Sequence, residues 1–331
     1  MKSHNRLILI VFGVIAGLWI IGFPFFREEF LKQFYYMPFL GVIAATVANT
    51  TPAAAGIVYF PILTRLHIDP ATAVQFSLII QAYGMGLGTF RWYFVNKKLF
   101  IANVIPVCLV GGILGITTSI VFVPIKNPGM LPLIFNSIAF VFTQIIFFSI
   151  LFKHKFPNLS IELNSFNTTI LLVFSFFGGL ISGWIGFGID TIFYFLLTVI
   201  FKINPAASIV TSISLMAAVS LAGTILNMLF NEVPFALWYS AIPGVTVAGL
   251  FLAAYLAVKI GAKNVLILFT FLLTVDFFMT FWTQNTIPMN QSVKMAITYA
   301  LVVYLLVIHV KIFKKSYQEI NTELGEFKPK Q

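Results

Sequence analysis

Long runs of apolar residues dominate this chain and set the strongest limit on its fold. A membrane-spanning helix needs about 20 predominantly apolar residues, and eight runs have a suitable length. These are residues 7–26, 70–93, 99–123, 128–152, 205–230, 234–258, 263–282 and 292–313. A membrane β-barrel would instead show short alternating segments. The runs therefore predict an all-α polytopic membrane protein.

The composition excludes most soluble classes of protein. Charged residues make up 9% of the 331-residue chain, whereas a typical soluble domain has about 25%. A soluble enzyme, a nucleic-acid-binding protein and a secreted disulfide scaffold are excluded on this ground. The single cysteine, Cys108, has no partner for an intrachain disulfide. The four histidines lack metal-ligand spacing, so we expect no metal.

Two further apolar runs, residues 37–66 and 166–201, are too long for one span. A helix of 36 residues would be about 54 Å long. Each run also contains a helix breaker near its middle, Asn49–Pro52 in the first and Gly183–Gly188 in the second. We therefore expect each run to form two short helices folded into a hairpin, with its tip inside the membrane.

The positive charges support this topology. Lys and Arg are enriched in cytoplasmic loops of membrane proteins. With both termini in the cytoplasm and each hairpin returning to its own side, fifteen of the 20 basic residues lie inside. Counting either long run as a single crossing destroys this bias. We expect a multi-pass protein of the cytoplasmic membrane with cytoplasmic N- and C-termini.

The two halves of the chain resemble each other. Ile68–Ala71 recurs as Ile203–Ala206 at an offset of 135 residues, and Ser77 matches Ser212 at the same offset. The spans that follow these motifs run in opposite directions, which predicts two inverted-topology repeats. Each repeat consists of a broken-helix hairpin plus three transmembrane helices, and one extra helix lies at each end of the chain. The expected divisions are 1–36 (first helix and outer loop), 37–152 (first repeat), 153–165 (cytoplasmic linker), 166–282 (second repeat), 283–313 (last helix) and 314–331 (cytoplasmic tail).

The hairpin tips are the predicted binding site. Irregular backbone at membrane depth is tolerated only where it is buried in protein or lines a cavity. A helix that starts at such a break directs its N–H groups and positive dipole end towards that place, which suits a small anion. The predicted substrate-binding residues at the tips are Asn49, Thr50, Thr51, Ser182, Gly183, Gly186 and Gly188. The alternative is that the glycines only permit tight helix packing.

Polar residues in the following spans extend this predicted site. Ser77 lies two turns into one span, and Thr211 and Ser212 lie at the corresponding place in the other. We expect their hydroxyl groups to complete an anion shell, and the alternative role is hydrogen bonding between helices.

Two carboxylates lie inside apolar spans, Asp190 and Asp276. Intramembrane carboxylates are costly and are functional candidates by default. A protonatable group beside an anion site would couple transport to protons. For Asp190 the alternative is a capping role at the start of its half-helix, and for Asp276 it is a hydrogen bond to a neighbouring span.

At these residues the chain resembles the sulfite exporter TauE/SafE family of membrane permeases. The resemblance is strongest in the second half, where Gly179–Asp190 stands for the Gly-rich break and Ile203–Ile213 for the turn and Thr-Ser pair. In the first half, Ala48–Gly56 replaces the Gly-rich break. The resemblance covers roughly residues 37–282 and implies transport of a small sulfur-containing anion without a cofactor.

The function predicted from the sequence is secondary transport of a small anion by alternating access. The chain has no nucleotide-binding motif, so an ion or substrate gradient must supply the energy. Transport of another solute, such as a carboxylate or a cation-linked solute, and an anion channel stay open as alternatives. An enzyme is not expected, because no histidine lies near either carboxylate in the sequence. The expected partners are the lipid bilayer and the anion, with proton coupling and homo-oligomer formation left open.

Overall fold

The computed structural model describes residues 2–125, 127–151, 160–256 and 290–326, together with 259, 271, 274, 275, 277, 278, 281 and 282. Within these residues every regular element is a helix. Six helical segments are long and apolar enough to cross a membrane, namely Arg6–Phe34, Ile105–Phe122, Ser165–Ile185, Pro205–Phe230, Phe235–Leu252 and Gln291–Ile308. The predicted all-α membrane architecture is confirmed.

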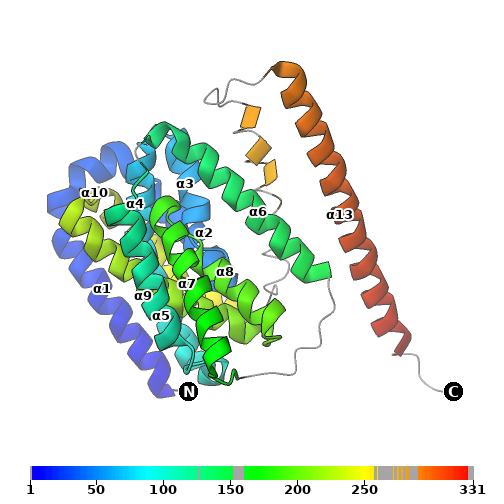
Figure 1. The fold of residues 1–331 in the computed structure, drawn as a ribbon. Coiled ribbons are helices and arrows are strands. Elements are labelled where there is room, and N and C mark those ends of the chain that lie inside the picture. Colours follow the sequence, from blue (N-terminus) through cyan, green and yellow to red (C-terminus); the bar gives the residue numbers. More distant parts are fainter. Residues whose placement is uncertain are drawn as a thin grey trace.

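The helices follow one another in the order expected from the apolar runs (Figure 1). The first half contains α1 (Lys2–Glu29), α2 (Met37–Thr50), α3 (Gly56–Arg65), α4 (Pro70–Asn96), α5 (Ile105–Thr117) and α6 (Leu131–Leu151). The second half contains α7 (Ser165–Ile185), α8 (Ile189–Phe195), α9 (Pro205–Phe230), α10 (Phe235–Val247) and α11 (Ala253–Leu256), and α13 (Gln291–Glu326) is the last helix. Single π-helical turns extend α5, α8 and α10.

Both long apolar runs are interrupted, as predicted. The first break is Thr51–Ala55, between α2 and α3, and the second break is Gly186–Gly188, between α7 and α8. The chain folds back at the second break, since a Cβ atom on Gly178 of α7 would lie 2.9 Å from Cα of Ile189. The residues of both breaks are buried, so protein rather than lipid surrounds the interrupted backbone.

The turns before α4 and α9 are built in the same way. His67 and Lys202 both adopt positive φ, at 63° and 53°. Asp69 then accepts a hydrogen bond from the backbone of Thr72, and Asn204 accepts one from Ala206. A proline follows each capping residue and occupies the first helical position, where its missing N–H costs nothing. The sequence match at an offset of 135 residues therefore corresponds to a shared local structure.

Helices of the two halves pack against each other in matching pairs. The long helices α4 and α9 lie together, while α5 packs along α7 and α10 packs along α2. Glycines permit both of the latter contacts: a Cβ atom on Gly115 would lie 2.0 Å from the carbonyl oxygen of Phe176, and one on Gly244 would lie 1.7 Å from that of Pro38. Small residues allow helices in membranes to approach this closely. The inverted direction of the two halves stays a prediction.

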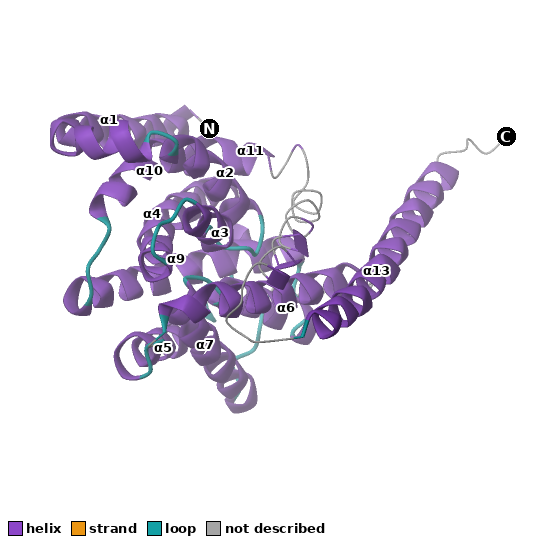
Figure 2. Ribbon diagram, turned by 90° about the horizontal axis from the view of Figure 1, so that it is seen from above, coloured by secondary structure: helices purple, strands orange, loops and turns teal. Residues whose placement is uncertain are grey.

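The helices at the two ends of the chain lie at opposite edges of the bundle (Figures 1 and 2). Helix α1 packs on α10, where the Trp19 and Tyr239 rings stack at 5.5 Å and Trp19 Nε1 donates to the carbonyl of Tyr239. Helix α13 packs on α6. Large apolar side chains of both outer helices are exposed, for example Phe25 and Leu306. These faces suit contact with lipid.

Candidate functional site

The two breaks meet at one junction beside α4. Thr191 Oγ1, at the start of α8, donates a hydrogen bond of 2.8 Å to the carbonyl oxygen of Pro52 in the first break. Gln81 Nε2, on α4, donates one of 2.6 Å to the carbonyl oxygen of Gly186 in the second. A Cβ atom on Gly56 would lie 2.8 Å from that same oxygen. Segments about 130 residues apart in sequence therefore form one buried polar junction.

Glycine backbone conformations build the second break. Gly186 has φ of 80° and Gly188 has φ of 144°, values that side chains of L-residues strongly disfavour. Ser182 Oγ then accepts a hydrogen bond of 3.0 Å from the backbone N–H of Ile189, which satisfies one orphan donor at the start of α8. Gly183 serves packing, since a Cβ atom there would lie 1.9 Å from Ser119 Oγ.

Side-chain hydrogen bonds build the first break. Thr51 is extended, with φ of −136°, and its Oγ1 donates to the carbonyl of Val47 and accepts from the N–H of Ala53. Thr50 Oγ1 donates a hydrogen bond of 2.8 Å to the carbonyl oxygen of Thr46. Both hydroxyl protons are therefore committed to the end of α2 in this conformation.

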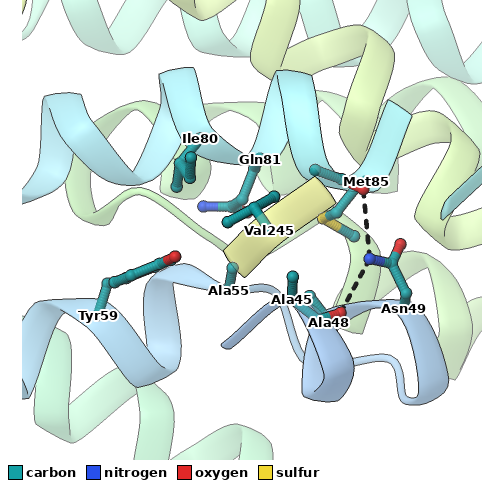
Figure 3. Close-up of a pocket in the computed structure, with 10 residues that line it drawn as sticks. Ala45, Ala48, Asn49, Ala55, Tyr59, Ile80, Gln81, Met85 and Val245 are labelled. Carbon is teal, nitrogen blue, oxygen red and sulfur yellow. Dashed lines mark hydrogen bonds between the residues drawn. The ribbon is translucent and has the colours of Figure 1, made fainter. Parts of the chain in front are cut away.

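A narrow, mostly apolar space with a few polar groups lies between α2, α3 and α4 (Figure 3). Asn49 Nδ2 donates to the carbonyls of Ala45 and Gly84, at 2.8 and 3.2 Å. Three buried oxygen atoms at this space have no hydrogen-bond partner among the described residues: Asn49 Oδ1, Tyr59 Oη and Gln81 Oε1. The space measures about 170 Å³ but is nowhere wide enough for a water molecule. This part of the junction is closed.

Asp190 is the titratable group at the junction. It is fully buried at the start of α8. Backbone N–H groups surround its carboxyl group, contributed by Gly188, Asp190 and Thr191 of its own segment and by Ala54 of the first break. None of them meets the geometry of an ordinary hydrogen bond, and both oxygens lack a partner within the described part of the chain. The carboxyl group thus lies where N–H groups of the two breaks converge.

The other predicted site residues, Ser77, Thr211 and Ser212, lie in different surroundings from one another. Ser77 adjoins the second break, since a Cβ atom on Gly186 would lie 2.8 Å from Cβ of Ser77. Ser212 Oγ donates within α9, to the carbonyl of Ile209. Thr211 accepts a hydrogen bond from the N–H of Ile101, in the loop before α5, so it lies with that loop. Asp276 lies outside the described residues.

Sequence reasoning missed two polar residues of the junction, Tyr59 and Gln81. Gln81 lies one turn beyond Ser77 on α4, and a buried amide in an apolar run was a detectable signal. Tyr59 lies in an apolar half-helix rich in aromatic and β-branched residues, where nothing distinguishes it from a packing residue. Among the described residues, no group of three His, Cys, Asp or Glu side chains could hold a metal ion.

Comparison with known proteins gives one match. The family model described as sulfite exporter TauE/SafE matches residues 37–277, which is more than half of the chain and includes both breaks. A search of curated proteins and a search of solved structures each found no match.

Proposed function

Because the chain belongs to the sulfite exporter TauE/SafE family, whose members are membrane transporters, we propose that it moves a sulfite- or organosulfonate-type anion across the cytoplasmic membrane by alternating access. The observation that carries this proposal is the junction of the two breaks. It joins the two halves of the chain through the Thr191–Pro52 and Gln81–Gly186 hydrogen bonds. A site held between two halves can open to either side when one half moves against the other.

The junction suits an anion rather than a cation. Helices α3 and α8 both begin there, and the start of a helix presents unpaired N–H groups and the positive end of its dipole. Discontinuous helices of transporters direct such ends at anionic groups of the substrate. In the proposed site, the backbone of both breaks holds the anion, with Asn49, Thr50, Thr51 and Ser182 around it. Gly186 and Gly188 keep the backbone accessible, Gly183 lets Ser119 pack closely against the end of α7, and Ser77 lies beside the second break.

The place of Asp190 supports proton coupling. Its carboxyl group faces N–H groups of both breaks, so an ionised Asp190 and a bound anion would compete for the same donors and repel each other. Protonation of Asp190 removes this repulsion and frees the N–H groups. We propose that the anion binds together with a proton on Asp190, and that Asp276 relays this proton. Thr211 and Ser212 complete the shell when the halves move.

The charge distribution supports the proposed orientation, with both termini in the cytoplasm. Fifteen of the 20 basic residues then lie on the cytoplasmic side, as the positive-inside tendency favours. In this orientation the ends of α4 and α5 that flank Lys97 and Lys98 face the cytoplasm.

Transport in proteoliposomes tests the proposal. The purified chain is reconstituted, and uptake of sulfite, thiosulfate, sulfoacetate, taurine and acetate is compared with uptake into protein-free liposomes. We expect uptake of at least one sulfur oxyanion, accelerated when the proton gradient is directed with the anion. Uptake of acetate alone would discard the proposed substrate. Uptake of a sulfur oxyanion at a rate that does not depend on the proton gradient would contradict proton coupling but would support the proposed substrate.

A further inference from the structure

A second space opens on the other side of the second break, between the start of α4 and the end of α9. It measures about 140 Å³, well above the roughly 10–15 Å³ that one water molecule needs. Val74, Gln75, Ser119, Gly183, Trp184 and Asn227 contribute to its wall. It extends to the level of the second break, since a Cβ atom on Gly186 would lie 3.2 Å from the carbonyl oxygen of Val74. We call this space the vestibule.

Two side-chain amides give the vestibule hydrogen-bond donors. Asn227 is 4% exposed, and Asn231 Nδ2 donates to its Oδ1 at 2.8 Å. This contact uses the side-chain oxygen of Asn227 as an acceptor. The amide N–H groups of Asn227 have no acceptor among the described residues. The Gln75 amide likewise has no partner there. The described lining contains no charged side chain. Neutral amide donors can bind an oxyanion without holding it as firmly as a fixed positive charge would.

The equivalent place at the other end of α4 and α9 is filled. At the offset of 135 residues that relates the two halves, Asn227 corresponds to Trp92, and Gln75 corresponds to Val210. Trp92 and Val210 form a small apolar cluster, completed by Leu99 and Phe100. Trp92 Nε1 also donates a hydrogen bond of 2.9 Å to the carbonyl oxygen of Asn49. The indole of Trp92 therefore fills the place next to the first break, whereas the amide of Asn227 borders an open space.

The two places lie far apart along the same pair of helices. Gln75 and Trp92 are 17 residues apart on α4, which corresponds to about 26 Å along the helix axis. The junction of the breaks, at Ser77 and Gln81, lies between them. The space at one end is open and lined in part by polar groups, and the corresponding place at the other end is filled by an apolar cluster.

Building on the proposed transport function, we propose that the vestibule is an access subsite in which the amide N–H groups of Gln75 and Asn227 hold a small oxyanion before it reaches the junction, while the Trp92–Val210 cluster closes the opposite end. In the orientation proposed above, the vestibule faces the outside. The subsite is distinct from the junction, because its donors are side-chain amides of α4 and α9 rather than the backbone of the breaks.

Cysteine accessibility tests this proposal. Gln75→Cys and Val210→Cys are matched, since they occupy corresponding places in the two halves, and each is made in a Cys108→Ala background. Buried Cys108 provides a control for non-specific reaction in the wild type. The purified full-length variants are treated with a cationic thiosulfonate reagent, with and without methanesulfonate. We expect the Gln75→Cys thiol to react about tenfold faster or more than the Val210→Cys thiol. Protection is measured with Ala71→Cys in the same background, because Ala71 also lines the vestibule and this variant keeps both amides. We expect methanesulfonate but not chloride to slow the reaction of Ala71→Cys.

Two results would overturn the proposal. Equal reaction rates at the two cysteines would contradict an open vestibule opposite a closed cluster. Fast reaction of Ala71→Cys without protection by methanesulfonate, in a preparation that transports this anion, would contradict the subsite and leave the transport function intact. A preparation that transports no sulfur oxyanion would instead contradict the proposed function itself.

A second variant tests the subsite through kinetics. Asn227→Leu removes the amide donors at nearly constant volume, and we expect KM for the transported anion to rise about 3- to 10-fold with little change in kcat. Met228→Leu is the control, because Met228 lies on the exposed face of the same helical turn, with 50% of its surface accessible. An unchanged KM in Asn227→Leu would contradict a role of this amide in holding the anion.

Discussion

The first break turns through Thr51–Ala55 without a residue at positive φ, whereas the second turns through Gly186 and Gly188, both at positive φ. The first is held by hydroxyl groups that bond the end of α2. The second is held by glycine conformations and by one serine that accepts the N–H of Ile189. The same interruption of a membrane helix can therefore be built from side chains or from backbone, and each solution fails under different substitutions.

The breaks also differ in charge. Asp190 is the second residue after the second break, and the residue at the corresponding offset in the first half is Ala55. The proposed anion shell is therefore shared between the halves, while the group that would respond to protons belongs to one of them.

The largest expected effect concerns this difference in charge. Asp190→Asn removes the titratable group and should lower proton-driven transport by about 100-fold, while anion binding persists and no longer depends on pH. The control is Asp69→Asn, since Asn204 performs the same capping role in the second half. Uptake of the anion with an imposed pH gradient measures the effect. An equal loss in both variants would contradict a special role of Asp190.

The next largest effect concerns backbone conformation. Gly188→Ala places a side chain at φ of 144°, with its Cβ atom 2.7 Å from Cγ2 of Ile181. This substitution should lower the free energy of unfolding by about 2 kcal/mol or more. Ala53→Gly in the first break adds freedom to the unfolded chain and removes one buried methyl group, and it should lower the free energy of unfolding by less, about 1–2 kcal/mol. Thermal unfolding in detergent compares the two melting temperatures, and a larger decrease in Ala53→Gly would contradict the account.

A smaller effect concerns the hydroxyl groups. Ser182→Ala leaves the buried N–H of Ile189 without an acceptor and should cost about 1–3 kcal/mol. Thr51→Val should cost less, because the N–H of Ala53 loses a longer hydrogen bond, 3.3 Å against 3.0 Å for the N–H of Ile189. The carbonyl of Val47 also keeps a hydrogen bond from the backbone N–H of Thr51. The same unfolding measurement applies. If Thr51→Val were the more damaging substitution, the two breaks would not be held as described.

The smallest effect concerns the contact between the breaks. Thr191→Val removes the hydrogen bond to the carbonyl of Pro52 and should cost about 0.5–1.5 kcal/mol. Combined with Gln81→Met, which removes the bond to Gly186, it forms a double-mutant cycle. We expect a coupling energy above about 0.5 kcal/mol, the limit for independent sites. If the two changes in the free energy of unfolding were strictly additive, the Thr191–Pro52 and Gln81–Gly186 hydrogen bonds would not belong to one junction.

Much of the fold could be predicted from the sequence because the membrane imposes simple rules. Apolar runs of suitable length predicted the described helices, and the excess length of two runs predicted breaks at Asn49–Pro52 and Gly183–Gly188. Most of the predicted span at residues 263–282 lies outside the described residues. The motifs at Pro70 and Pro205 predicted two equivalent helix starts, which the capping geometry confirms.

The composition of the site was less accessible to prediction. Asp190 stood out because a carboxylate in an apolar run is costly, but the packing of α4 against both breaks depends on tertiary contacts that no local pattern encodes. Gln81 and Tyr59 were missed for this reason. Thr211 shares the spacing of Ser77 in the other half, yet it bonds the loop before α5. Equivalent sequence places have diverged in their surroundings.

Proton uptake on anion binding tests the central claim most directly, which is that the anion and the Asp190 carboxyl group share the junction. Methanesulfonate is added to weakly buffered purified protein between about pH 5 and about pH 9, and the protons exchanged per bound anion are measured with an indicator dye. The account predicts proton uptake that approaches one per anion where Asp190 is ionised, and none in Asp190→Asn. Anion binding without proton uptake at any pH would contradict it.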